Sequence, residues 1–260
     1  FVQRRLLEDE AYGPADAGAL ADDVVARDEG FAEVAYVHGR DPAKAAQAFP
    51  DVHFLKDAAA IAGEDVDLVV EAATADVVSA IALDVLARRD MLTFTMTAFA
   101  DDDFRQAVSE QCRKSGTRLY IPHGGIIALD GINDGSTVID EIKITTTKAP
   151  KKLGLEDLTT EGVIYDGPTR AACTVFPRNV NVHACIALCG IGFDRTHSII
   201  IADPKTTKMA HVIEVKGDGL EWRIEIAAVA GSGVSGVYTP ISGVNTVRRI
   251  VLRDYDIVLA

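Results

Sequence analysis

His211 is the residue whose type and position best suit proton transfer. It starts a β-branched, strand-like run and follows a polar loop that begins at Asp203 and Pro204. Loops at strand ends often carry catalytic residues, and a neutral imidazole accepts a proton near neutral pH. The local pattern alone leaves a structural histidine as the more frequent alternative. No comparable pattern surrounds the histidines at His38, His53, His183 or His197.

Asn181 and the pair Gly124-Gly125 could contact a polar or planar ligand. Asn181 stands at the start of a helical run, where Asn is favoured as an N-cap and where helix N-termini attract polar groups. Adjacent glycines let the backbone approach a flat ring closely. A tight turn between a strand and a helix would require the same residues, so the glycines alone do not indicate a ligand.

The first half of the chain has the pattern of alternating strands and helices. This alternation is typical of βαβ units and a parallel sheet, and the continuously apolar LVV within the strand at 67–72 fits a sheet covered on both faces. The predicted strands are 31–37, 67–72, 92–96 and 118–121, and the predicted helices are 15–29, 43–48, 75–88 and 104–115.

After Pro122 the pattern changes to β-branched strands without regular intervening helices. Such a pattern predicts a mostly antiparallel sheet in an α+β domain. The predicted strands are 141–147, 197–202, 211–215 and 222–228, with a helix at 181–189. A further helix at 242–252 and a strand at 257–259 complete the chain.

A G-x-G-x-x-G motif, the usual phosphate-binding turn of dinucleotide-binding domains, does not occur in this sequence. The first residues, FVQRRLLEDE, have the character of the middle of the helix that follows such a turn. We therefore expect a helix from residue 1 and, in the natural protein, an additional first strand and phosphate loop.

Composition excludes several classes of protein. A net charge of −13 argues against a nucleic-acid partner, and no apolar stretch approaches the roughly 20 residues of a membrane span. The charged N-terminus does not resemble a secretory signal, so a cytoplasmic protein is expected. The four cysteines form no C-x-x-C pair, which predicts free thiols and no metal site.

From Asp67 onward the sequence resembles the L-aspartate dehydrogenase family, whose fold is related to homoserine dehydrogenase and dihydrodipicolinate reductase. The order and spacing of several motifs carry the resemblance. They are VVEAAT at 69–74, TAFADD at 97–102, IPHGGIIALDG at 121–131, TKAPKKLGL at 147–155, FPRNVNVHA at 176–184 and IIADPKTTKMAHVIEV at 200–215.

The resemblance implies a reaction and three site residues. The family oxidatively deaminates L-aspartate with NAD or NADP, and in many organisms the iminoaspartate product feeds NAD biosynthesis. His211 matches the active-site histidine, and Gly125 matches a residue that contacts the nicotinamide cofactor. Asn181, favoured over Asn179 by its spacing to the histidine, matches a second cofactor contact. A homodimer is also implied.

Two carboxylates on the substrate require a cationic partner. Arg178, Lys148 and Lys151 lie in the matched motifs and are candidates, although each is equally explicable as surface charge. The sequence alone assigns none of them as a site residue.

At three places in the chain the sequence departs from the expected pattern. His123 replaces a usual Ser, and Ile127-Ala128 replaces a frequent Gly-Gly. At the end of the second strand, where NAD-binding folds place an acidic residue, the sequence has His38 followed by Arg40. An arginine there would accommodate a 2′-phosphate, so NADP is a plausible cofactor, and an exposed turn arginine without a ligand is the alternative.

These observations predict a two-domain oxidoreductase. A Rossmann-type parallel-sheet domain covers 1–122, with 239–260 packing back on it, and an α+β domain with a mostly antiparallel sheet covers 123–238. Substrate and nicotinamide are expected to meet at the domain interface. Two alternatives remain open: a related oxidoreductase acting on another small carboxylate, and a non-catalytic nucleotide-binding protein.

Overall fold

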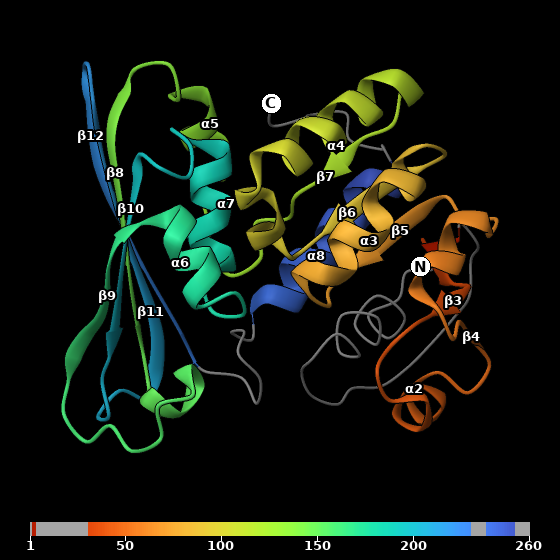
Figure 1. Cartoon of the computed structure of the whole chain (residues 1–260), viewed down its shortest axis with the longest axis horizontal. Helices are drawn as coiled ribbons and strands as arrows, with labels where there is room; N and C mark the ends of the chain where they lie inside the picture. Colours follow the sequence, from red (N-terminus) through yellow and green to blue (C-terminus); the bar gives the residue numbers. More distant parts are fainter. Residues whose placement is uncertain (1, 4–30, 230–237, 253–260) are drawn as a thin grey trace. The chain divides into compact units, whose positions relative to one another are not determined.

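The chain forms two compact units, each built around a five-stranded sheet (Figure 1). The structure, a computed structural model, describes residues 2–3, 31–229 and 238–252. The first unit comprises Phe1–Phe94, Gln106–Pro122 and Pro240–Ala260, and the second comprises Thr95–Arg105 and His123–Thr239. Residues 95–105 thus belong to the second unit, whereas the sequence interpretation placed everything before residue 123 in the first.

The first unit is Rossmann-like, as predicted. Three of its strands run parallel, and the helices between them provide the crossovers that parallel pairing requires. The sheet order is β2 (Glu33–Val34), β1 (Val2–Gln3), β5 (Leu68–Glu71), β6 (Asp90–Thr93) and β7 (Leu119–Tyr120). The crossover helices are α3 (Ala75–Leu86) and α4 (Asp102–Ser115).

The expected helix from residue 1 is wrong at Val2–Gln3, which form strand β1. This strand lies between β2 and β5 and is antiparallel to both, with Val2 opposite Val34 and Leu68. Backbone groups at the centre of a sheet need hydrogen-bond partners, and β1 supplies them to both neighbours. The predicted helix at 15–29 and the predicted strand at 257–259 lie outside the described residues.

The remaining elements of the first unit complete its core. Helix α8 (Tyr238–Leu252) places Val244 and Val247 against Leu68 and Leu92 of the sheet. Helix α2 begins where the Asp41 side chain accepts hydrogen bonds from two backbone amides. The short elements are α2 (Pro42–Ala48), β3 (Tyr36–Val37), β4 (His53–Phe54) and the 3₁₀ helix η1 (Ala58–Gly63). Among the helices that the structure describes, none has both the length and the apolar character to cross a membrane.

The second unit contains the predicted mostly antiparallel sheet. Only the β8–β10 pair is parallel, and the other neighbours are antiparallel. The order is β12 (Leu220–Val229), β11 (Lys208–Gly217), β8 (Ile139–Lys148), β10 (Thr196–Ala202) and β9 (Gly162–Pro168). Strand β9 was not predicted, because its sequence GVIYDGP lacks apolar alternation and carries Gly and Pro.

One face of this second sheet is buried. Residues alternate between buried and more exposed along β8, β10 and β11, as expected for strands with one covered face. Three helices lie on the same side of the sheet (Figure 1). They are α5 (Leu129–Asp134), α6 (Thr169–Val175) and α7 (Asn181–Cys189); further 3₁₀ turns are η2 (Met96–Ala100) and η3 (Pro150–Leu153).

Candidate functional site

Polar side chains gather on the buried face of the second sheet. His211 on β11 lies directly opposite Thr146 on β8, and Lys148 follows two residues later on the same face. On β10, Ser198 occupies another buried position. Buried polar groups cost free energy unless they are hydrogen-bonded, so this cluster requires an explanation beyond packing.

His211 is held at one ring nitrogen and has no partner at the other. The side chain is 2% exposed, and its Nδ1 lies 2.8 Å from the Thr146 hydroxyl. Its Nε2 is buried and has no hydrogen-bond partner among the described residues. Burial, and then the nearby charge of Lys148, lower the pKa of His211 to about 3. The free imidazole is therefore neutral, with one nitrogen available.

His183 is a second fully buried histidine in the same cluster, and sequence reasoning did not select it. It lies on α7, with Nε2 2.6 Å from the Thr146 hydroxyl and Nδ1 2.9 Å from the Ser198 hydroxyl. Burial, followed by the proximity of His211 and Lys148, holds its pKa well below the usual value. Thr146 thus bridges two neutral imidazoles.

The hydrogen-bonded cluster continues beyond Ser198 to the first residue of α6. The Thr169 hydroxyl lies 2.7 Å from Ser198 Oγ and donates to the carbonyl oxygen of Thr196 at 3.0 Å. All of these side chains are buried. A continuous line of hydrogen bonds therefore runs from a backbone carbonyl to His211.

Lys148 is the only one of the three candidate carboxylate partners that is buried. Its Nζ donates to the backbone carbonyl of Asn179 at 3.2 Å and lies 3.5 Å from the Asn179 side-chain oxygen. Burial, with a smaller contribution from Lys152, lowers the pKa of Lys148 to about 8. Arg178 and Lys151 are exposed. This separates Lys148 from two residues that the sequence ranked equally with it.

Asn181 begins helix α7 but does not cap it. The cap position belongs to Val180, and the Asn181 side-chain oxygen accepts a hydrogen bond from the backbone amide of Thr97 at 3.2 Å. The expected N-cap role is therefore wrong, because the oxygen is turned toward another segment. Its Nδ2 group has no hydrogen-bond partner within the described residues.

The segment around Gly125 combines a special backbone conformation with an unpaired histidine atom. Gly124 has φ 61°, the left-handed region that favours glycine. A Cβ on Gly125 would lie 3.3 Å from Thr239 Oγ1, so a side chain here would require Thr239 to shift by a few tenths of an ångström. Within the described residues, the buried Nδ1 of His123 lacks a hydrogen-bond partner. Ala128 has φ 65°, a left-handed conformation that the frequent family glycine would adopt without strain.

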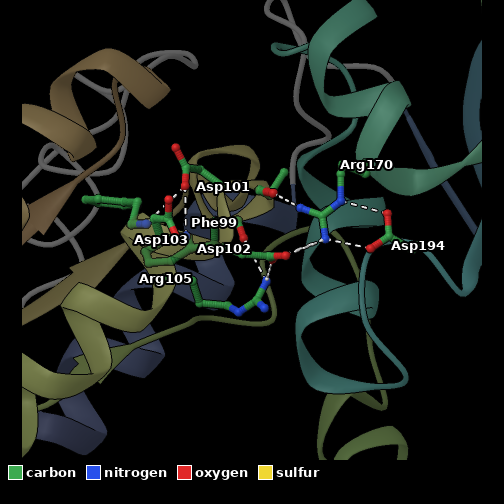
Figure 2. A network of polar contacts seen from close by, with 9 residues as sticks. Phe99, Asp101, Asp102, Asp103, Arg105, Arg170 and Asp194 are labelled. Atoms are coloured by element: carbon green, nitrogen blue, oxygen red, sulfur yellow. Dashed lines mark hydrogen bonds and ion pairs between the residues drawn. The ribbon is translucent and has the colours of Figure 1, made fainter.

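An arginine network fixes residues 95–105 within the second unit (Figure 2). Arg170 on α6 forms paired hydrogen bonds with Asp194, each 2.7 Å long, and contacts Asp102 at 3.1 Å and the carbonyl of Ala100. Asp194 is the largest cause of the raised pKa of Arg170. Because this network and the Thr97–Asn181 hydrogen bond both hold the TAFADD segment, we infer that it helps to position Asn181.

In the first unit, His38 has a structural partner and Arg40 is exposed. His38 Nδ1 lies 2.8 Å from the carbonyl oxygen of Leu55, and its ring stacks on Phe54 with centroids 6.2 Å apart. A carbonyl can only accept, so His38 donates and ties β3 to the segment after β4. Arg40 is left at the surface, where it could contact a ligand phosphate.

Asp203 does not contact His211. Its side-chain oxygen accepts a hydrogen bond from the backbone amide of Lys205 at 2.8 Å, and its carbonyl accepts from Thr206 at 3.2 Å. These are the contacts of a turn that ends β10. The turn interpretation of Asp203-Pro204 is confirmed.

Two family models match adjacent parts of the chain. Residues 130–250 match the model described as "Aspartate dehydrogenase, C-terminal". Residues 5–122 match the model described as "Homoserine dehydrogenase, NAD binding domain". The two matches fall on the two halves that the change of pattern after Pro122 separates.

Curated relatives and solved structures agree with these matches. The L-aspartate dehydrogenase of Nitrosopumilus maritimus is 30% identical over 211 residues, covering 76% of this chain and 78% of the relative. That of Methanosarcina barkeri is 32% identical over 203 residues, covering 72% and 75%. The crystal structure of Thermotoga maritima aspartate dehydrogenase superposes with a TM-score of 0.74 at 25% identity, covering 94% of this chain and 96% of that one.

Proposed function

Because the chain belongs to the L-aspartate dehydrogenase family, we propose that it oxidatively deaminates L-aspartate with NAD or NADP. The products are iminoaspartate and the reduced cofactor, and hydrolysis of the imine gives oxaloacetate and ammonia. The observation that carries the proposal is the buried His211, whose Nε2 has no partner among the described residues and which lies near the buried cation of Lys148.

His211 is the proposed base. Oxidation of an amino acid requires the ammonium group to lose a proton, and the later hydrolysis requires a water to lose one. The unpartnered Nε2 of His211 is a group that can accept either proton. When bound, the nicotinamide supplies the acceptor for the hydride that leaves Cα of aspartate.

Lys148 is the proposed partner of a substrate carboxylate. A carboxylate placed against its Nζ would form a charge-assisted hydrogen bond and offset its positive charge. That charge is the second cause of the low pKa of His211. Substrate binding therefore strengthens the base, which is a weak proton acceptor in the free enzyme.

Asn181 and Gly125 are the proposed cofactor contacts. The Asn181 oxygen is occupied by Thr97, which leaves its Nδ2 to donate to a carbonyl such as that of the nicotinamide carboxamide. The residues at 123–125 fit a planar ligand, since they combine two glycines with a buried, unpaired His123 Nδ1 in the described structure. We assign dinucleotide binding mainly to residues 1–122 with 239–260, and substrate binding, catalysis and these two nicotinamide contacts to 123–238.

A cytoplasmic homodimer completes the proposal. All four cysteines are free, as expected in a reducing compartment, and the family resemblance implies a dimer. Size-exclusion chromatography with light scattering measures the oligomeric state, and a monomer at assay concentrations would contradict the dimer.

The proposed function is tested by following NADH and NADPH formation with a panel of amino acids. We expect turnover with L-aspartate and with at least one of the two cofactors. Glutamate, asparagine and homoserine serve as controls, since each changes one carboxylate or its distance from Cα. Turnover with homoserine but not with aspartate would instead indicate a related oxidoreductase. No turnover with any substrate would favour a non-catalytic nucleotide-binding protein.

A further inference from the structure

We propose that a chain of four buried polar side chains holds His211 in the tautomer that carries its proton on Nδ1. The chain consists of Thr169, Ser198, His183 and Thr146. These are positioning residues, since they act on the base and not on the substrate. The inference rests on the proposed function only for the role of His211 as a base.

The donor-to-acceptor direction of these hydrogen bonds is set at the first of them, because its acceptor is a backbone carbonyl that cannot donate. Thr169 Oγ1 lies 3.0 Å from the carbonyl oxygen of Thr196, so the threonine donates its single hydroxyl proton there. Thr169 then has no proton left for its 2.7 Å contact with Ser198. Ser198 must therefore be the donor in that contact.

The same reasoning fixes the tautomer of His183. Ser198 has used its only proton, so the 2.9 Å contact between Ser198 Oγ and His183 Nδ1 requires the proton to be on Nδ1. Full burial close to His211 and Lys148 holds the pKa of His183 well below its usual value. His183 is therefore neutral, and its Nε2 is an acceptor.

Thr146 transmits this choice to His211. Its hydroxyl donates to His183 Nε2 at 2.6 Å, so the 2.8 Å contact with His211 Nδ1 requires a proton on that nitrogen. Within the described residues, the hydroxyls of the chain make no other hydrogen bond. The lone pair of neutral His211 is thus at Nε2, the buried atom without a partner.

This arrangement suits a base that must gain a proton quickly. Proton uptake at Nε2 leaves Nδ1 donating to Thr146, so no hydrogen bond of the chain has to reverse. The chain ends in a backbone carbonyl, which does not take up a proton, so it orients the imidazole and does not conduct protons away. Groups positioned before the reaction save the cost of reorganisation during it.

If the hydrogen bonds of the chain ran in the opposite direction, His211 could not act as a base through Nε2. A protonated His183 would donate from Nε2 to Thr146, and Thr146 would then turn its proton toward His211 Nδ1. His211 would carry its own proton on Nε2 and could not accept another there. The titratable groups near His183 are His211 on β11 and Lys148 on β8, and a positive charge on either disfavours its protonation.

The direct test is the tautomer of His211 in the full chain at neutral pH. In protein labelled with ¹⁵N-histidine, the two ring nitrogens have different shifts according to which one carries the proton. His211→Gln and His183→Gln assign two of the six histidines. We expect the proton on Nδ1 in both His211 and His183. A proton on Nε2 of His211, or an equal mixture, would overturn the proposal.

Thr169→Val tests the chain at its far end, since Thr169 has no hydrogen bond to either histidine. Removing the anchoring hydroxyl frees Ser198 to donate to His183, so we expect His211 to become a mixture of tautomers. We expect kcat to fall at unchanged KM. The loss should be about twofold if the wrong tautomer makes up half of the population, and about tenfold if it outnumbers the right tautomer by about ten to one. Thr169→Ser should restore both readouts.

Thr145→Val is the matched control, since it removes a hydroxyl from the other face of β8. It should leave the tautomer unchanged. An unchanged His211 tautomer in Thr169→Val would overturn the proposal, and if that variant does not fold, the wild-type spectrum decides. The spectrum does not depend on turnover. An inactive wild type with His211 protonated on Nδ1 would therefore refute the proposed function but would still support the proposed hydrogen-bond chain.

Discussion

Strands β8 and β11 give the buried face of the second sheet an apolar end and a polar end, whereas on β10 the order is reversed, with Ser198 opposite Ile144 and Ile200 opposite Thr146. At the apolar end, Ile144 of β8 lies opposite Ile213 of β11, and both are fully buried. Two residues along, Thr146 lies opposite His211, followed by Lys148. The register, strand direction and degree of burial are shared, so only the chemistry of the side chains differs between the ends.

The apolar end contributes to the stability of the fold, whereas the polar end lowers stability and is suited to the reaction. The apolar pair stabilises the fold by burial, with roughly 1.5–3 kcal/mol for each side chain of this size. The polar end costs free energy, since burial lowers the pKa of both Lys148 and His211. A sheet selected for stability alone would carry isoleucine or valine there, so the polar end indicates a site.

His211→Gln breaks the polar end at the proposed base and should have the largest effect. We expect kcat to fall by roughly 10²- to 10⁴-fold, the usual contribution of a general base, while cofactor affinity stays the same. Aspartate-dependent NAD(P)H formation measures kcat, and cofactor titration by fluorescence measures affinity. Turnover within threefold of the wild type would remove His211 from the mechanism.

The two ends should respond differently to acid, because only the polar end carries side chains that take up protons when the protein unfolds. The pKa of His211 is about 3 in the folded protein and about 6.5 for an unperturbed histidine in the unfolded chain, so protons favour the unfolded state. Stability from His211 is therefore present above pH 6.5 and is lost as pH falls from 6.5 toward 3. We expect a slope of about 1.4 kcal/mol per pH unit for each such histidine, on the order of 5 kcal/mol in total for His211.

Urea unfolding at several pH values between 7 and 4 measures this slope. His211→Gln should remove the part of the slope that is due to His211. The part due to His183 should remain, because the pKa of His183 is also lowered. Ile213→Val, at the apolar end, should lower stability equally at every pH. A His211→Gln variant with the wild-type slope would show that the histidine is protonated without penalty.

Lys148→Met should weaken substrate binding by a smaller factor. Loss of one charge-assisted hydrogen bond, about 1.5–3 kcal/mol, should raise the KM for aspartate roughly 10- to 150-fold. Lys151→Met is the matched control, since Lys151 is exposed and should leave KM unchanged. Equal effects of the two substitutions would contradict a direct contact with Lys148.

The pH dependence of KM provides an independent test of Lys148. Burial and, to a smaller extent, the charge of Lys152 lower the pKa of Lys148 to about 8, and the charge of Lys148 in turn helps to lower the pKa of His211. The cation is therefore lost as pH rises through about 8, and the wild-type KM for aspartate should increase there. The Lys148→Met variant should not show this increase, and a rise that persists in it would assign the titration to another group.

The sequence predicted four of the five strands of this sheet and one residue of its polar end, but it predicted neither β9 nor the cluster. Runs of β-branched residues indicated β8, β10 and β11, and the family motifs singled out His211. His183 was missed because it lies in the apolar helical run NVHACIALC, where nothing local shows its contact with Thr146, 37 residues away in the chain. Lys148 was indistinguishable from Lys151 for the same reason: burial is a property of the packed sheet.

Ile213→Val tests the apolar end alone and should have the smallest effect. Removing one methyl group from this fully buried position should lower the free energy of unfolding by about 0.5–1.5 kcal/mol. Because Ile213 lies on the same face as His211 but two residues away, kcat for aspartate should stay within twofold of the wild type. Denaturant unfolding and steady-state kinetics on the same preparation measure both quantities. A tenfold loss of kcat would show that the apolar end positions His211, and the two ends would then have to be treated as a single functional unit.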